Sequence, residues 1–229
     1  MFAGSETGRS AAKMRMRLGS PTSQRTLAFV DGFGFDSTMI RSVCVFSSSS
    51  DAVAPHYMEA ASALGALMAE QKLTLVYGGG KVGLMGALAR AVHANGGKVV
   101  GVIPHYLRKK EVAYEDADEL IVTKCLRERK AVMEERADAF VALPGGFGTL
   151  EEILEILTLK QLEAHGKPVV FLNTNGFFEP LLAMFERLYH EQFTKRDYCG
   201  HYHIADAPSA VLAHFVGYLP PPKVHKWFN

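Results

Sequence analysis

The sequence predicts an α/β fold, built as a single doubly wound, Rossmann-like domain with a mostly parallel sheet and helices on both faces. Short apolar runs typical of strands alternate with segments of helical spacing, as in successive βαβ units. The runs are apolar throughout rather than alternating, which is expected when helices cover both faces of a parallel sheet. Small residues, chiefly glycine and serine, follow several of these runs and indicate tight strand-to-helix turns.

Breaker residues bound the expected elements. Four serines follow the first apolar run, three glycines follow the second, and Pro104 closes the third. Helical spacing of apolar residues defines the segments between the runs. The predicted strands are 42–46, 73–77, 98–103, 120–123, 139–143, 169–172 and 204–205. The predicted helices are 55–71, 82–94, 126–136, a helix that opens within 144–152 and ends at 166–168, 178–190 and 208–216.

Composition excludes several classes of protein. The 229 residues are 48% hydrophobic, which is enough for a sizeable core, and the net charge of +1 gives no field that would attract nucleic acid or a membrane surface. No apolar run approaches the roughly 18–20 residues of a membrane-spanning helix. Cys44, Cys125 and Cys199 form no CxxC pair, so a zinc site or disulfide framework is not expected. We therefore expect a small-molecule partner and a reducing, intracellular setting.

The two ends of the chain differ from its middle. Residues 1–40 are rich in arginine and serine, and Glu6 is the only acid before Asp31. Such a segment is typical of a disordered leader or of a transit peptide. The predicted organisation is an N-terminal extension at 1–40, the domain at 41–218 and a C-terminal tail at 219–229. The predicted location is the cytoplasm, with an organelle as the alternative if residues 1–40 are a targeting segment.

Three loops of small residues are expected to meet at one edge of the sheet. They are Ser47–Ser50, Gly78–Gly86 and Pro144–Glu152, and each follows a predicted strand. Ligands of doubly wound sheets bind beyond the carboxyl ends of the strands. This edge is therefore the predicted binding site.

The second loop fits G-x-G-x-x-G, from Gly78 to Gly83, between a strand and a helix. That pattern suggests a dinucleotide only when an acid ends the next strand and holds a ribose. Here the corresponding region, 102–105, contains no acid, and Lys81 does not fit a Walker A motif. We therefore prefer tight helix–strand packing beside a pocket of mononucleotide size.

The third loop is the strongest signal in the chain. Three glycines between Gly145 and Gly148 let the backbone approach a ligand closely, and the following helix N-terminus presents unpaired N–H groups to an anion. Thr149 is expected either to cap this helix or to bind a phosphate oxygen. The loop therefore predicts a phosphate site.

Two acids, Glu151 and Glu152, follow on the first turn of this helix, about 100° apart around its axis. The apolar spacing centres the core face near Leu150 and Leu157. This places Glu151 and Thr158 on one flank and directs Glu152 nearly opposite to the core. The role of Glu152 would then depend on a ligand or second subunit that covers that side.

Other polar clusters have competing interpretations. The segment from Arg127 to Lys130 places cations at a helix N-terminus, which favours an anionic ligand over a solvated face. His201 and His203, two residues apart, would share one face of a strand, but no third ligand has a recognisable spacing, so no metal is expected. Residues 108–110 are expected to form a solvated loop.

These residues resemble the LOG family, the cytokinin riboside 5′-monophosphate phosphoribohydrolases, many of which were once labelled "possible lysine decarboxylase". The family motif P-G-G-x-G-T-x-x-E is matched by Pro144 to Glu152, and the resemblance extends from about Arg41 to about Phe215. It includes V-Y-G-G-G-x-x-G-L-M-G at 76–86, G-V-I-P at 101–104 and D-A-F-V-A-L-P-G-G at 138–146. The chain departs from plant members at Leu126–Glu128, at Leu159 and in the all-serine first loop.

The resemblance implies a set of site residues. For the implied reaction we expect Glu152 and Arg129 to be catalytic, with no metal and no cofactor, and the residues alone do not distinguish Glu152 from Glu151 as the acid that acts in the chemistry. The implied substrate contacts, taken over position by position, are Glu111, Arg129, Lys130, Gly145, Gly146, Phe147, Gly148, Thr149, Leu150, Glu151 and Thr158. In the first two loops, Ser49, Gly79 and Gly80 are also expected to contact the substrate.

The implied activity is hydrolysis of the N-glycosidic bond of an adenosine 5′-monophosphate, plain or N6-modified, to a free base and ribose 5-phosphate. The resemblance also implies a homodimer with pockets at the interface. Two alternatives remain: a non-catalytic nucleotide-binding module, and a pyridoxal-phosphate-dependent lysine decarboxylase using Lys81, Lys130 or Lys160. The residues alone do not distinguish adenine from N6-prenylated adenine.

Overall fold

The computed structural model describes residues 40–110 and 113–224. Residues 1–39, 111–112 and 225–229 lie outside the described part. The predicted extension at 1–40, apart from Ile40, and the expected substrate contact Glu111 are therefore not tested by the structure, nor is the end of the predicted tail.

A seven-stranded sheet forms the centre of the domain, in the order β4-β3-β2-β1-β5-β6-β7. Every pair of neighbouring strands is parallel, so the sheet is wholly rather than mostly parallel. The sequence-based strands are confirmed to within a residue or so at each end. The strands are β1 (Ser42–Phe46), β2 (Thr74–Tyr77), β3 (Val99–Pro104), β4 (Glu119–Thr123), β5 (Ala139–Ala142), β6 (Val169–Leu172) and β7 (His203–Ala205).

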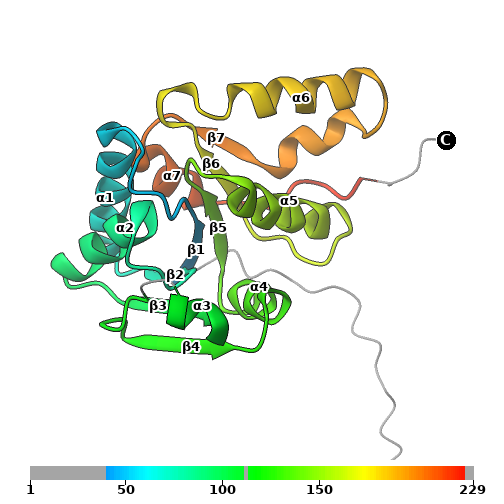
Figure 1. Cartoon of the computed structure of the whole chain (residues 1–229). Coiled ribbons are helices and arrows are strands. Elements are labelled where there is room, and N and C mark those ends of the chain that lie inside the picture. Colours follow the sequence, from blue (N-terminus) through cyan, green and yellow to red (C-terminus); the bar gives the residue numbers. More distant parts are fainter. Residues whose placement is uncertain (1–39, 111–112, 225–229) are drawn as a thin grey trace, which may run out of the picture. The chain divides into compact units, whose positions relative to one another are not determined.

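Helices cover both faces of the sheet, as predicted (Figure 1). On one face α1, α2 and α7 bury residues such as Leu64, Leu88 and Leu212 against the sheet. On the other face α4, α5 and α6 contribute Met133, Ile153 and Phe185 to a second core. The helices are α1 (Pro55–Glu70), α2 (Gly83–Ala94), α3 (His105–Lys110), α4 (Leu126–Glu135), α5 (Phe147–Gln161), α6 (Glu179–His190) and α7 (Pro208–Phe215), with short 3₁₀ helices η1 (Thr174–Gly176) and η2 (Arg196–His201).

Two local predictions are wrong. Residues 108–110, expected as a loop, end α3, and Arg108 forms an ion pair with Glu115 at 2.7 Å. His201 ends the 3₁₀ helix η2, whereas His203 begins β7, so the two histidines do not share a strand face. Both segments are short and polar, and such segments carry little periodicity from which a helix could be recognised.

The strand order places a topological switch point between β1 and β5. The chain continues from β1 toward β2, β3 and β4, and then crosses to the other side of β1 to form β5. The connections that leave these two neighbouring strands therefore diverge, and a crevice opens between them at their carboxyl ends. Asp138 secures this pair, since its carboxylate accepts hydrogen bonds from the backbone N–H of Arg41 and from the N–H and hydroxyl of Ser42.

Candidate active site

The serine loop after β1 is packed into the glycine-rich turn before α2. Asp51 accepts a hydrogen bond from the Gly83 N–H at 2.7 Å, and Ser48 O accepts one from the Met85 N–H at 3.3 Å. Gly83 has φ +59°, and a Cβ there would lie only 2.5 Å from the carbonyl carbon of Ser49. The N-terminus of α2 is thus occupied by this chain's own loop. This contact supports the packing interpretation of G-x-G-x-x-G over a dinucleotide site.

A cleft of about 370 Å³ opens at the switch point. Residues from all three predicted loops line it, which confirms that the loops converge at one edge. α3 and α4 complete the walls. The lining residues are Ser47, Ser48, Ser49, Ser50, Gly78, Met85, Leu107, Arg129, Gly146, Phe147, Gly148, Thr149 and Glu152.

The N-terminus of α5 forms one wall of the cleft. Gly146 is the N-cap residue and makes no side-chain capping bond, so the predicted capping role of Thr149 is wrong. Thr149 instead lies within the first turn, and its side chain occupies the space that a Cβ at Gly145 would need. A Cβ at Gly146 or Gly148 would meet nothing within 4 Å. The first-turn N–H groups of α5 therefore border open space in the cleft, where an anion could approach them.

A buried ion pair forms the floor of the cleft. Arg129 Nη1 donates to Glu152 Oε1 at 3.0 Å, and the two side chains are 13% and 10% exposed. Arg129 Nε also donates to the carbonyl oxygen of Val102 at the end of β3, at 3.0 Å. The guanidinium is thereby fixed between β3 and α5 with one edge left toward the cleft. Fixed donors of this kind stabilise charge without reorganising.

Gly78 permits this placement of Arg129. A Cβ at Gly78 would overlap Arg129 Nη2 and would approach Met85 Sδ to 3.0 Å. Any side chain at this position would therefore displace the guanidinium. The glycine after β2 is required by the arginine that it contacts, not by a bound pyrophosphate.

Burial shapes the electrostatics of the pair. It raises the pKa of the Glu152 carboxyl above its ordinary value, and the charge of Arg129 offsets part of this effect. Below the pair, burial raises the pKa of the Cys44 thiol, and the Glu152 charge raises it further. Cys44 is therefore a buried, protonated thiol. Glu152 is a carboxyl group whose pKa is raised because the cleft shields it from water.

The predicted direction of Glu152 is wrong. The buried residues of α5 are Thr149, Glu152, Ile153, Ile156 and Lys160, so Glu152 lies on the inward face of the helix. Leu150 and Leu157, taken as the centre of that face, are only partly buried. Arg129 of the same chain, rather than a second subunit, covers Glu152.

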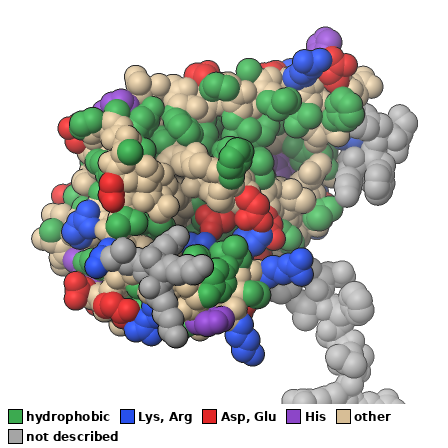
Figure 2. Space-filling view, in the orientation of Figure 1, with side chains coloured by type: hydrophobic (Ala, Val, Ile, Leu, Met, Phe, Trp, Pro, Cys, Tyr) green, Lys and Arg blue, Asp and Glu red, His purple; other side chains and the backbone are tan. Residues whose placement is uncertain are grey.

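The other acid, Glu151, turns outward. It is exposed and pairs with Lys130, which also contacts Glu155 at 2.7 Å. Although burial lowers the pKa of Lys130, its hydrogen bonds to these two acids raise it above its ordinary value. In Figure 2 acidic and basic side chains gather between α5 and α4. Lys130 and Glu151 therefore hold α4 against α5 beside the cleft rather than lining it.

Half of the predicted site residues that the structure describes lie together. The cleft contains Ser49, Arg129, Gly146, Phe147, Gly148, Thr149 and Glu152. Thr158 is exposed, bonds to Leu154 O at 2.8 Å and lies outside it. Also outside the cleft lining are Gly79, Gly80, Lys130, Gly145, Leu150 and Glu151. The lining further contains Ser47, Ser48, Ser50, Gly78 and Met85, which belong to the predicted loops but were not named as contacts, and Leu107, which no prediction included.

The described residues contain no group of three or more histidine, cysteine or acidic side chains arranged to hold a metal ion. Within the same residues, no helix combines the length and apolar character that crossing a membrane requires.

Doubly wound sheets bind their ligands at such a switch point, and an open helix N-terminus there is suited to an anionic group. The family model described as "Possible lysine decarboxylase" matches residues 85–215, and the chain belongs to this family, the LOG family. Curated relatives carry a more specific name. The rice (Oryza sativa subsp. japonica) "Probable cytokinin riboside 5'-monophosphate phosphoribohydrolase LOGL5" is 43% identical over 186 residues, 81% of this chain and 76% of the relative. The Arabidopsis thaliana "Cytokinin riboside 5'-monophosphate phosphoribohydrolase LOG7" is 47% identical over 151 residues, 66% of this chain and 70% of the relative.

Solved structures of other proteins share the fold. A molybdenum cofactor binding protein from Rippkaea orientalis matches with a TM-score of 0.59 at 23% identity, over 77% of this chain and 95% of that one. The molybdenum cofactor carrier protein of Chlamydomonas reinhardtii matches with a TM-score of 0.60 at 22% identity, over 77% and 98%. At this level of identity the likeness concerns the fold alone.

Proposed function

We propose that this protein hydrolyses the N-glycosidic bond of adenosine 5′-monophosphates, plain or N6-modified, and releases a free base and ribose 5-phosphate. The observation that carries the proposal is the buried Arg129–Glu152 pair beside the open N-terminus of α5. The first-turn N–H groups and the serine loop would bind the 5′-phosphate. This arrangement would place the ribose over the floor of the cleft.

The residues then have distinct roles. As the bond from C1′ to the base nitrogen breaks, positive charge develops on the ribose, and the Glu152 carboxylate would stabilise it. The electron pair of the broken bond leaves with the base, which takes up a proton, while the oxygen of a water molecule bonds to C1′ and loses one. Glu152 would accept that proton. Arg129 would orient the carboxylate and the phosphosugar.

The alternatives have less support in this chain. A pyridoxal-phosphate decarboxylase needs a lysine in its site, but no lysine lines the cleft among the described residues. Lys130 is held by two acids, and the buried Lys160 bonds to the hydroxyl of Tyr218 at 2.7 Å. A non-catalytic nucleotide-binding module would use the same anion site without the chemistry.

Base release is the experiment that separates these alternatives. Incubation with AMP and with N6-isopentenyl-AMP is expected to yield free base and ribose 5-phosphate in equal amounts, measured by chromatography. Comparing the two substrates also ranks adenine against its N6-prenylated form. Tight AMP binding without base release would identify a binding module, and an absorbance band of bound pyridoxal phosphate would favour the decarboxylase.

The assembly is a further part of the proposal. Thr158, an expected substrate contact, is exposed and outside its own cleft, and Phe147 at the mouth of the cleft is 93% exposed. Many hydrophobic side chains lie on the surface over α5 and α6 (Figure 2). A homodimer that packs α5 against a second copy would cover these residues and bring Thr158 to the other cleft. The cytoplasmic location stays a prediction, with an organelle as the alternative.

Sedimentation is expected to give twice the mass of the chain. In such a dimer Thr158→Val should raise KM for AMP by about threefold to tenfold, as expected for loss of one hydrogen bond to the substrate, without changing kcat. The nearby Leu162→Ala, which lies one turn further along the exposed surface, is the control for a general change in packing. A monomer with full activity would contradict this part of the proposal.

A further inference from the structure

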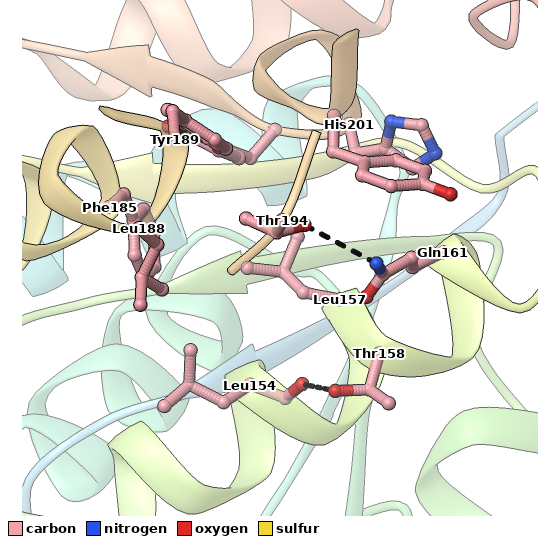
Figure 3. A pocket seen from close by; sticks show the side chains of 11 residues that line it. Leu154, Leu157, Thr158, Gln161, Phe185, Leu188, Tyr189, Thr194 and His201 are labelled. Carbon is pink, nitrogen blue, oxygen red and sulfur yellow. Dashed lines mark hydrogen bonds between the residues drawn. The ribbon is translucent and has the colours of Figure 1, made fainter. Parts of the chain in front are cut away.

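A second cavity, of about 340 Å³, lies between α5, α6 and the segment that contains η2 (Figure 3). It shares no lining residue with the cleft. Its size lies within the range of about 300–1,000 Å³ typical of small-molecule sites. Of its lining residues only Thr158 has a part in the proposed reaction, as a contact to the cleft of a second subunit.

The two ends of this cavity differ in chemistry. Figure 3 shows Phe185 and Leu188 at one end, with Tyr189 above them, and His201 and Gln161 at the other end. Tyr198 and Tyr202 complete an aromatic wall. An elongated molecule with a polar edge and an apolar end would satisfy both ends at once.

The polar end contains an unsatisfied group. His201 is only 8% exposed, and its Nδ1 has no hydrogen-bond partner among the described residues. Leaving such a group unpaired costs about 1–3 kcal/mol, so an unsatisfied buried nitrogen at a cavity wall requires an explanation. Gln161, beside it, makes only a long hydrogen bond to Thr194 at 3.4 Å. A ligand could pair with both side chains after small changes of rotamer.

The cavity is uncharged. Its described lining includes no carboxylate, amine or guanidinium. Burial, together with the nearby charge of Lys160, lowers the pKa of His201 to about 4, so the imidazole is neutral at neutral pH. Burial also raises the pKa of Tyr202. A nucleotide or a fatty acid would find no cation here, whereas a planar, uncharged ring would find aromatic walls and hydrogen-bonding groups.

We propose that this cavity is a second binding site, for an uncharged heteroaromatic molecule of purine size that carries an apolar substituent. The heterocycle edge pairs with His201 and Gln161, and the substituent lies against Phe185 and Leu188. Thr158 lies at the rim, so a second subunit packed on α5 would enclose the ligand. The free base released by the proposed reaction is one molecule of this class, but binding does not depend on that reaction.

Binding of N6-benzyladenine to the full-length protein, measured by isothermal titration calorimetry, tests the site. Thr194→Trp is expected to fill the cavity and weaken binding by about tenfold or more, as overpacking excludes a ligand of this size. Phe193→Trp is the matched control, because Phe193 is 80% exposed and does not line the cavity. His201→Phe, which removes the unpaired nitrogen, is expected to weaken binding while keeping the fold.

Three results would overturn the proposal. Binding that is unchanged in Thr194→Trp but is displaced competitively by AMP would place the base only in the cleft. AMP that binds the cavity as tightly as N6-benzyladenine would contradict its selection of uncharged ligands. A Thr194→Trp protein that loses its dimer while binding the base as before would make the cavity a subunit contact.

Discussion

Glu152→Gln is expected to lower kcat for base release from AMP by about 100-fold to 10,000-fold, the range for loss of a carboxylate that acts on the reacting atoms. The amide keeps the size of the side chain and can still accept a hydrogen bond from Arg129, but it can neither stabilise the ribose by its charge nor accept a proton. Because the first turn of α5 is unchanged, AMP should still bind. The expected signature is therefore a fall in kcat with little change in the affinity for AMP.

The matched control is Glu155→Gln on the same helix. Glu155 is 43% exposed and pairs with Lys130 rather than with Arg129. Its substitution should cost no more than about 1 kcal/mol in unfolding free energy and leave kcat unchanged, since exposed ion pairs contribute little. A Glu152→Gln protein that folds and releases base at the wild-type rate would show that another group performs the chemistry.

Most of the fold follows from local pattern in the sequence. Short, wholly apolar runs such as 139–143 and 169–172 have few interpretations other than buried parallel strands, and glycine, serine or proline marks several of their ends. The convergence of three loops follows from the sheet alone, since parallel strands end at one edge. These inferences need no knowledge of distant contacts.

The details of the site depend on contacts between distant residues. A hydrophobic pattern treats every charge as exposed, and it therefore predicts that Glu152 lies on the outward face of α5. In the structure it is buried because Arg129, 23 residues earlier, reaches it from α4. Lys160 is buried on the same helix, with Tyr218 as its partner. Polar residues on the inward face of a helix are therefore misplaced by periodicity whenever their partners come from other elements.

Gly78 illustrates the same limit. In the second loop, Gly79 and Gly80 are the expected ligand contacts. In the structure only Gly78 of these three glycines lines the cleft. A side chain at this position would overlap the guanidinium of Arg129. Arg129 belongs to α4 and lies 51 residues later in the sequence. No spacing rule within the loop could have identified it.

Arg129→Gln is expected to have the largest effect on stability. Removing one partner of a buried ion pair leaves the other charge uncompensated, which costs about 3–5 kcal/mol in unfolding free energy. Arg136→Gln is the matched control: Arg136 lies at the end of the same helix and pairs with Glu119, but the two side chains are 47% and 40% exposed. Its loss should cost less than about 1 kcal/mol. Chemical denaturation of the three proteins measures both values.

The pH dependence gives this prediction a sign. Burial raises the pKa of Glu152, and Arg129 lowers it, so in Arg129→Gln the carboxyl holds its proton to a higher pH than in the wild type. Between the two pKa values the native variant carries a proton that the native wild type has lost. The stability difference between wild type and variant should therefore grow as pH rises through this window, while Arg136→Gln shows no such growth.

The same shift should appear in catalysis. If the ionised carboxylate is the active form, kcat/KM for base release falls as pH drops through the Glu152 pKa, and the midpoint of this acidic limb lies above the ordinary glutamic acid value of 4.5. In Arg129→Gln, whatever activity remains should show the limb at a higher pH than in the wild type. An acidic limb of kcat/KM that stays at the same pH in Arg129→Gln, while stability falls, would contradict this expectation. Arg129 would then support the fold of the cleft without setting the charge of Glu152, and another group would titrate in the reaction.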